Sequence, residues 1–407
     1  MNYLLNIFLF ILVASLNAQE IKTAQLFNPQ TNDLTPFISK SEYLIFSFDD
    51  LEAGYKRYQY KIVRYDRNWE RSDIFTSEYL DGYDKNYIRE YTNSFNTRVN
   101  YTHYQVSIPN NDFSFKLSGN YGVQLLAPNS NQILLEKRFS VYEDITQLGV
   151  SVNRMNSADN LNQLVAVQIN SPDFDLTQNQ NESLLVLLKN NNWNESLKVN
   201  QPSFAQPNQF TFNKPDQSFA GGNEYNWFDT KNLEISGLTT QNIIKEDIYS
   251  TVLYPISFSP DQAYVDMPDV NGNYFIRSTQ IPYPSKANSE ADYTEVYFAL
   301  EGYKPEADEE VFVFGAFNNF QPTEESILHY INDTQLLETN MLLKQGYYNY
   351  SFAIRNTKTG KIDYNKITGS YWQTENLYTA LFYYRPWGKR YDLLIGYGEG
   401  FSRPSPR

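Results

Sequence analysis

The chain has 407 residues but contains no cysteine and only two histidines. Without cysteine the protein has no disulfide bonds, no thiolate metal ligands and no cysteine that could carry a lipid anchor. The histidines, His103 and His329, each lie in a tyrosine-flanked stretch with the character of a β-strand, which favours a structural role for both. We therefore expect no metal site built on cysteine or histidine, and no cofactor.

Motifs for catalysis are scarce as well. The sequence lacks the Gly-x-Ser-x-Gly motif that carries the nucleophile of many serine hydrolases. Residues 269–273 (DVNGN) only superficially resemble a calcium loop, because an EF-hand has glycine sixth and glutamate twelfth, whereas here Gly272 is fourth and Gln280 is twelfth. We interpret this segment as a tight turn. No carboxylate pair stands out among the 47 acidic residues, so the sequence predicts a non-enzymatic protein without catalytic or metal-binding residues.

Positive charge is in short supply. The chain carries 33 Lys and Arg residues against 47 Asp and Glu residues, a formal net charge of −14 at pH 7. Binding to nucleic acid or to an anionic lipid surface depends on an excess of basic side chains. The composition therefore disfavours both as partners.

Long apolar runs are absent beyond the first residues. Residues 1–18 have an apolar centre from Leu4 to Leu16, which is typical of a secretory signal peptide cleaved after Ala18. Two features depart from the usual pattern: no basic residue precedes the apolar run, and Leu16 rather than a small residue lies three positions before the cut. No later stretch approaches the roughly 20 apolar residues of a membrane helix. We expect a protein that leaves the cytoplasm without inserting directly into a membrane.

Aromatic residues are abundant and make up 16% of the chain, with 34 Tyr and 27 Phe. Apolar and aromatic residues recur with the two-residue period of β-strands, as in residues 44–48 and 58–62. Tyrosine is favoured on half-buried sheet faces and at interfaces, because its ring packs while its hydroxyl stays hydrated. The pattern predicts an all-β protein that presents an interaction surface.

The strand spacing predicts three tandem β-sandwich domains, arranged in a row after a signal peptide at residues 1–18. Residues 19–143 are expected to form an immunoglobulin-like or fibronectin-like sandwich, because a Tyr-rich strand with a Trp after it is followed by a late Gly-x-Tyr strand. A second sandwich is expected over 144–283 and a third over 284–407. Residues 315–320 (GAFNNF) close a hydrophobic strand, which makes the third unit similar to early-set sandwiches of the glycogen-binding kind.

The same hexapeptide leaves open an alternative function, binding of a glycan. Sugar platforms are flat, exposed rings, most often Trp, and Phe320 stands where that family usually carries Trp. A buried ring that ends a core strand is the favoured interpretation. A periplasmic or surface glycan-binding protein stays the alternative.

Several segments together resemble one family, known first as a domain of unknown function and later as the plug protein of the type IX secretion system of Bacteroidetes. The resemblance spans nearly the whole mature chain, and its most specific part is residues 373–376 (QTEN) followed by 383–385 (YYR) and 391–392 (YD). The other matching segments are 60–69 (YKIVRYDRNW), 79–83 (YLDGY), 220–229 (AGGNEYNWFD), 269–274 (DVNGNY), 291–293 (ADY) and 369–397.

The resemblance implies a function. Proteins of this family bind the periplasmic end of the outer-membrane translocon barrel, a SprA-like channel in gliding bacteria, and block it while no substrate is in transit. A wide, water-filled barrel would otherwise leak solutes. The implied role is a non-enzymatic plug subunit in the periplasm, with the barrel as partner and other type IX secretion subunits as further partners. Residues 403–407 (RPSPR) show no obvious C-terminal export domain, so we expect retention in the periplasm.

The last hairpin is the predicted docking region. Residues 369–397 are predicted to form two aromatic-rich strands around a turn at 386–389, without a nucleophile or a metal-binding cluster. Aromatic residues and arginine are enriched at interface hot spots, and the turn is expected to protrude. The alternative is that these residues only pack the hairpin. The predicted partner-binding residues are Trp372, Gln373, Glu375, Asn376, Tyr383, Tyr384, Arg385 and Trp387.

Overall fold

The computed structural model describes residues 21–31, 33–34, 36–281, 283 and 286–403. The predicted signal peptide and residues 404–407 lie outside these ranges. The chain is 49% strand and 6% helix, with several antiparallel sheets, so the all-β prediction is confirmed. No helix within the described residues is long and apolar enough to cross a membrane.

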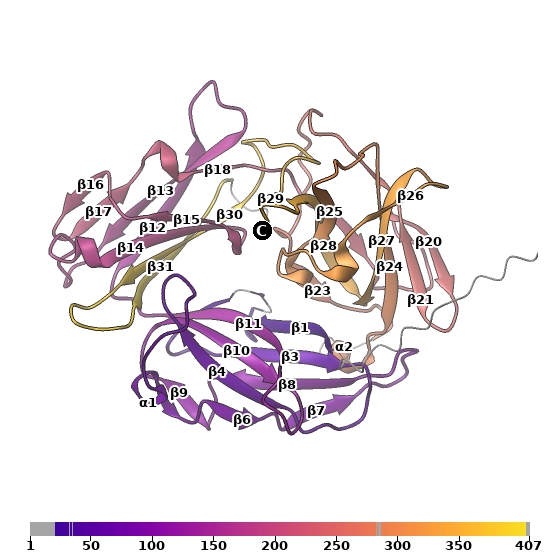
Figure 1. Cartoon of the computed structure of the whole chain (residues 1–407), viewed down its shortest axis with the longest axis horizontal. Helices are drawn as coiled ribbons and strands as arrows, with labels where there is room; N and C mark the ends of the chain where they lie inside the picture. Colours follow the sequence, from indigo (N-terminus) through magenta and orange to yellow (C-terminus); the bar gives the residue numbers. More distant parts are fainter. Residues whose placement is uncertain (1–20, 32, 35, 282, 284–285, 404–407) are drawn as a thin grey trace, which may run out of the picture.

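Three lobes of sheet surround a common junction (Figure 1). We call residues 21–143 lobe 1, residues 144–220 together with 377–403 lobe 2, and residues 221–376 lobe 3. The lobes are not arranged in the row that the sequence suggested, because each of them contacts the other two. The molecule is therefore a three-cornered block rather than a rod.

Lobe 1 has a four-stranded and a five-stranded sheet around one apolar core. Both strands expected near residues 44–48 and 58–62 are present, and their alternating apolar side chains are buried as predicted. A short helix, α1 (Thr76–Tyr79), precedes the pair β5 (Leu80–Gly82) and β9 (Phe113–Phe115). The strand order of the four-stranded sheet is β1 (Ile21–Phe27), β3 (Leu44–Asp50), β8 (Thr102–Ile108) and β7 (Glu90–Asn93). The order of the five-stranded sheet is β2 (Phe37–Ser39), β11 (Ile133–Tyr142), β10 (Gly119–Leu126), β4 (Gln59–Tyr65) and β6 (Lys85–Tyr87).

Lobe 2 is built from two sheets whose inner faces share an apolar core. In β13 every second side chain is buried, which is the pattern of a strand with one face on the core. The first sheet is β12 (Gln147–Arg154), β13 (Asn162–Asn170), β17 (Gln209–Phe212) and β16 (Phe204–Gln206), with β18 (Ser218–Ala220) also on β13; the second is β15 (Asn192–Val199), β14 (Ser183–Lys189), β30 (Leu377–Tyr384) and β31 (Leu393–Phe401). The turns η1 (Gln180–Glu182) and η2 (Pro215–Gln217) precede β14 and β18.

Lobe 3 also has two sheets, and the long strand β28 (Gly346–Asn356) lies at the centre of one of them. Its partners are β19 (Asn226–Asp229), β23 (Tyr274–Ile276), β25 (Glu309–Phe314) and β29 (Ile362–Asp363). The other sheet is β20 (Thr240–Lys245), β21 (Tyr249–Leu253), β24 (Tyr293–Glu301), β27 (Leu336–Lys344) and β26 (His329–Ile331), with β22 (Ile256–Ser257) on β24. Short helical segments are α2 (Ala287–Glu290), η4 (Ala316–Asn318) and η5 (Glu324–Ser326).

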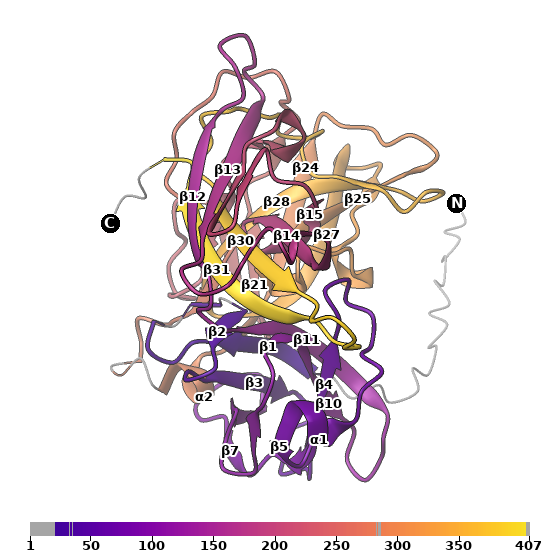
Figure 2. The same ribbon diagram turned by 90° about the vertical axis from the view of Figure 1, so that its left-hand side faces the viewer.

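The C-terminal hairpin pairs with lobe 2, not with the unit that the sequence placed over 284–407 (Figure 2). Every residue of β14 is buried, and the strand has β15 at one edge and β30 at the other. A buried strand needs two neighbours because its backbone polar groups are shielded from water. Likewise, β19 to β23, expected within 144–283, pair with strands of lobe 3. Pairing between distant segments leaves no local sequence signal, so the strand pairing crosses the expected boundary between residues 283 and 284.

The glycine run at the end of β31 lets another strand cross it closely. A Cβ atom on Gly396 would lie 2.2 Å from Oγ1 of Thr146, and one on Gly398 would lie 2.7 Å from Cβ of Leu148. Real Cβ atoms do not approach other atoms to 2.2 Å, so no side chain fits at Gly396 without a shift. The run therefore serves the packing of β12 on β31 within lobe 2.

Candidate docking surface

The eight predicted partner-binding residues have three different environments. Only Trp387, in the turn between β30 and β31, is largely exposed, at 89%. Two residues are buried, Asn376 and Tyr383. The other five are half-buried: Trp372, Gln373, Glu375, Tyr384 and Arg385.

Asn376 holds together the base of the hairpin. Its Nδ2 donates to the carbonyl oxygen of Gly221 at 2.8 Å and to Oε1 of Gln163 at 3.1 Å. Its Oδ1 accepts a hydrogen bond from Nδ2 of Asn190 at 2.7 Å. Because both ends of the amide are bonded inside the protein, Asn376 has no free group for a partner.

Tyr383 joins lobe 2 to lobe 1. Its hydroxyl donates to Oδ1 of Asn120 at 2.8 Å, and the same oxygen accepts a hydrogen bond from Oγ of Ser140 at 2.8 Å. The docking role predicted for Tyr383 and Asn376 therefore has no accessible surface in this fold. The prediction misassigned them because aromatic and amide groups are suited both to interfaces between proteins and to interfaces between lobes.

The base of the turn is fixed by a bidentate ion pair. Nε and Nη2 of Arg385 each lie 2.8 Å from a carboxylate oxygen of Asp392. The backbone N–H of Arg67 donates to Oδ2 of Asp392 at 2.9 Å, and Nη2 of Arg64 donates to its backbone carbonyl. A bidentate ion pair between arginine and a carboxylate is stronger than a single neutral hydrogen bond. The turn therefore stands on a rigid support made by lobes 1 and 2.

Sequence reasoning missed a second exposed aromatic side chain, which lies on a loop that an ion pair links to the turn of Trp387. Phe75, in the loop before α1, is 74% exposed. The two loops are linked by Arg390, whose Nη1 lies 3.1 Å from Oδ2 of Asp73. We call Trp387 and Phe75 the aromatic tip. In the sequence Phe75 directly follows Ile74 in an otherwise polar stretch, and this pattern does not tell which of the two side chains is exposed.

Three segments behind the family resemblance meet around Glu375. Nδ2 of Asn271 donates to Oε2 of Glu375 at 3.0 Å, and the N–H of Glu375 donates to Oε1 of Glu224 at 3.1 Å. Burial raises the pKa of both glutamates, and it raises the pKa of the nearby Asp269 to about 7. Within the described residues, no group of three or more His, Cys, Asp or Glu side chains is arranged to hold a metal ion.

The turn interpretation of residues 269–273 is confirmed. Asn271 and Gly272 have φ angles of 55° and 79°, the left-handed conformations that tight turns require. A Cβ atom on Gly272 would lie 2.7 Å from the ring of Phe320, which is itself buried. The interpretation of Phe320 as a buried ring is confirmed too, so this ring offers no platform to a sugar.

A buried ionic cluster joins lobe 1 to lobe 3. Oδ2 of Asp49 lies 2.6 Å from Nζ of Lys344 and accepts a hydrogen bond from the hydroxyl of Tyr293 at 2.6 Å. Its other oxygen, Oδ1, lies 2.7 Å from Nδ1 of His103. Burial alone would raise the pKa of Asp49, but the charge of Lys344 and the hydrogen bond of His103 hold it below its usual value. We call these four residues the Asp49 cluster.

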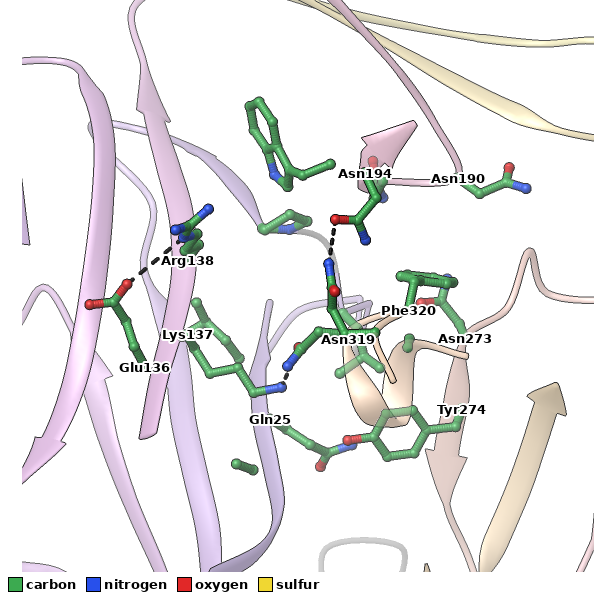
Figure 3. A pocket seen from close by; sticks show the side chains of 18 residues that line it. Gln25, Glu136, Lys137, Arg138, Asn190, Asn194, Asn273, Tyr274, Asn319 and Phe320 are labelled. Atoms are coloured by element: carbon green, nitrogen blue, oxygen red, sulfur yellow. Dashed lines mark hydrogen bonds and ion pairs between the residues drawn. The ribbon is translucent and has the colours of Figure 1, made fainter. Parts of the chain in front are cut away.

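The lobes enclose a cavity of about 370 Å³ at their junction (Figure 3). Lobe 1 contributes Lys137 of β11, lobe 2 contributes Trp193 and Asn194 at the start of β15, and lobe 3 contributes Asn319 and Phe320 after η4. Nζ of Lys137 donates to Oδ1 of Asn319 at 2.8 Å. The cavity is therefore a place where one molecule could touch all three lobes.

Comparison with known proteins places this architecture in a family. Residues 21–143 match the family model described as the type 9 secretion system plug protein, first domain. The solved structure of a hypothetical protein from Parabacteroides merdae ATCC 43184 is similar, with 31% identity and a TM-score of 0.88, over 94% of this chain and 97% of that chain. No curated protein matches. The family model covers all of lobe 1, the Parabacteroides relative has a similar fold over 94% of this chain, and the chain belongs to the type 9 secretion system plug protein family.

Proposed function

We propose that this protein is a plug subunit that resides in the periplasm, binds the periplasmic end of the type 9 outer-membrane translocon barrel and closes the channel while no substrate is in transit. The family match over residues 21–143 carries the proposal. The role is non-enzymatic and consists of obstructing an opening. It requires a broad body that keeps its shape.

The contacts between lobes support such a role. A flexible body would lose conformational entropy on docking, and this loss would weaken the complex. Here the Asp49 cluster fixes lobe 1 to lobe 3, and the Arg385–Asp392 pair with Arg67 fixes lobe 2 to lobe 1. A protein whose three lobes are fixed relative to one another can obstruct a channel without losing conformational entropy when it binds the partner.

We place the docking contact at the aromatic tip. Trp387 and Phe75 are large, exposed apolar side chains, and Trp387 lies on the turn that the Arg385–Asp392 pair supports. Such side chains dominate the energy of many interfaces. No packing role within the described chain explains why these two side chains are exposed. Arg385 and Tyr384 lie at the base of the same turn and are half-buried, so they support the contact from below.

The test combines affinity purification with a leak assay. Tagged wild-type protein should recover a barrel subunit larger than itself, and deletion of the gene should make cells sensitive to large antibiotics. The double variant Trp387→Ala with Phe75→Ala should recover at least about tenfold less barrel, the loss typical of a truncated hot spot. Leu238 is 88% exposed on lobe 3, so Leu238→Ala is the matched control and should behave as wild type.

Two results would contradict the proposal in different ways. Purification without a barrel subunit, together with unchanged permeability of the deletion strain, would exclude the plug role. Normal recovery of the barrel by the double variant would exclude the aromatic tip as the docking contact while leaving the plug role intact.

A further inference from the structure

The junction cavity has an unusual charge balance. Three charged residues line it: Glu136, Lys137 and Arg138. Glu136 already accepts hydrogen bonds from Tyr65 and Gln124, each at 2.6 Å, and lies 3.8 Å from Arg138. The acid and the arginine are thus engaged with each other and with side chains of lobe 1, which leaves Lys137 to determine what the cavity attracts.

Lys137 has no acidic partner in the described part of the chain. Its Nζ bonds to the neutral amide of Asn319, and no carboxylate of a described residue lies within 4.0 Å of it. Burial lowers the pKa of Lys137 to about 8, so the side chain still carries its charge at neutral pH. A partly desolvated ammonium without a counterion gains strongly from an anion placed beside it.

The rest of the lining is suited to a small polar molecule with a carbon skeleton. The ammonium contacts the side-chain amide of Asn319, and elsewhere in the lining Nε2 of Gln321 donates to Oδ1 of Asn194 across the boundary between lobes 2 and 3 (Figure 3). Trp193 supplies an apolar wall. Small-molecule sites typically combine a largely apolar lining with a few placed polar groups, in cavities of about 300–1,000 Å³.

We propose that the junction cavity is a binding site for a small carboxylate. The carboxylate pairs with Nζ of Lys137, the amide nitrogen of Asn319 donates to a hydroxyl or carbonyl oxygen of the ligand, and Trp193 packs against its carbon atoms. Two sources share this chemistry, a sugar acid and the free C-terminus of a peptide. The site does not rest on the plug role, because no residue of the aromatic tip belongs to it.

Such a ligand contacts all three lobes at once. It binds the assembled junction and not the unfolded chain, so it raises the free energy of unfolding in proportion to the logarithm of its concentration. Binding of a small acid in the cavity would thereby stabilise the arrangement of the three lobes.

The test uses the full mature protein and isothermal titration calorimetry. The probes are glucuronate against glucose for the sugar acid, and the tripeptide Gly-Ser-Ala with a free C-terminus against its C-terminal amide. At least one acid should bind, and its neutral counterpart should bind roughly tenfold or more weakly, the effect of losing a charged hydrogen bond. The acid that binds identifies the source.

Two variants test the role of Lys137. Lys137→Met removes the charge at similar length, and Asn319→Asp leaves the lysine in place but gives it a carboxylate partner at the 2.8 Å position. Both should lose the binding of the acid roughly tenfold or more. Lys61→Met is the matched control, because Lys61 pairs with Asp84 at 3.8 Å on lobe 1 and does not line the cavity.

Several results would overturn the proposal. They are binding of neither acid at millimolar concentration, equal binding of acid and neutral probe, and unchanged binding by a folded Lys137→Met or Asn319→Asp. If Lys137→Met fails to fold, Asn319→Asp alone decides, since it keeps every side chain close to its original size. Recovery of the barrel subunit by these variants is measured in parallel, so failure of the binding site and failure of the plug role are distinguished.

Discussion

Asp49, which is buried, and Asp269, which is half-buried, have opposite surroundings. Asp49, contributed by lobe 1, has Lys344 and His103 beside its carboxylate, and its pKa is held below the usual value. Asp269, near the boundary with lobe 2, has only backbone N–H donors and the acidic neighbours Glu224 and Glu375, and burial raises its pKa to about 7. The first site keeps its negative charge, whereas the second readily takes up a proton.

The comparison shows that the same side chain has two different roles in this fold, one as part of an ion-paired cluster that joins two lobes and one as a group that titrates. A buried charge is tolerated when a partner of opposite charge and good geometry offsets the loss of hydration, and removing one partner is then costly. The Asp49 cluster has that property and draws its members from two lobes. Asp269 lacks a cation, so its contribution to stability depends on pH.

The largest effect on the free energy of unfolding is expected when the cation of the Asp49 cluster is removed, because Asp49 then lacks a lysine partner as Asp269 does. Lys344→Met leaves the carboxylate of Asp49 buried with only His103 near it, and it should lower the free energy of unfolding by about 3–5 kcal/mol. The measurement is equilibrium unfolding in urea. Lys358 pairs with Asp308 while 73% of its side chain is exposed, so Lys358→Met is the control and should change little.

A second variant sharpens this prediction. Adding Asp49→Asn to Lys344→Met should recover part of the loss, because no charge is then left buried without a partner. Lys344→Met protein with wild-type stability would show that the Asp49 cluster does not hold lobes 1 and 3 together.

A smaller effect is expected at the contact between lobes 1 and 2. Asp392 is buried and its side chain pairs with Arg385 and the N–H of Arg67. Asp392→Asn keeps the shape but removes the charge, and it should lower the free energy of unfolding by about 2–3 kcal/mol. Hydrogen exchange should become faster in the turn that carries Trp387. Unchanged exchange there would mean that the pair does not support the turn.

The smallest effect is the pH dependence that Asp269 causes. Its pKa is about 7 in the folded state against 3.8 ordinarily, so the folded protein holds the proton more tightly than the unfolded chain. The free energy of unfolding should therefore fall as the pH rises from about 4 to about 7, by about 1–2 kcal/mol after allowance for partial exposure. Asp269→Asn should not show this component, which urea unfolding at several pH values measures. Identical pH profiles for the two proteins would contradict the assignment.

The exposure of some predicted docking residues could be expected from the sequence, and the burial of others could not. Trp387 lies in a Pro-Trp-Gly turn, and turns protrude, so its exposure could be expected from residues 386–388 alone. Asn376 and Tyr383 have side chains equally suited to an interface, but their burial depends on Gln163 and Asn120, which lie far away in the sequence. Phe75 joined the aromatic tip only because the ion pair between Arg390 and Asp73 links the two loops.

The sequence by itself determined the all-β class, the strands with period-two burial, the turn at residues 269–273 and the burial of Phe320. Each of these depends on neighbouring residues, because alternation and turn chemistry act over a few positions. Only the tertiary structure decided that the hairpin β30–β31 completes lobe 2, that the lobes surround a junction, and that Lys137 faces a cavity there. Alternation fixes which face of a strand is buried, but it does not specify which distant strand will lie beside it.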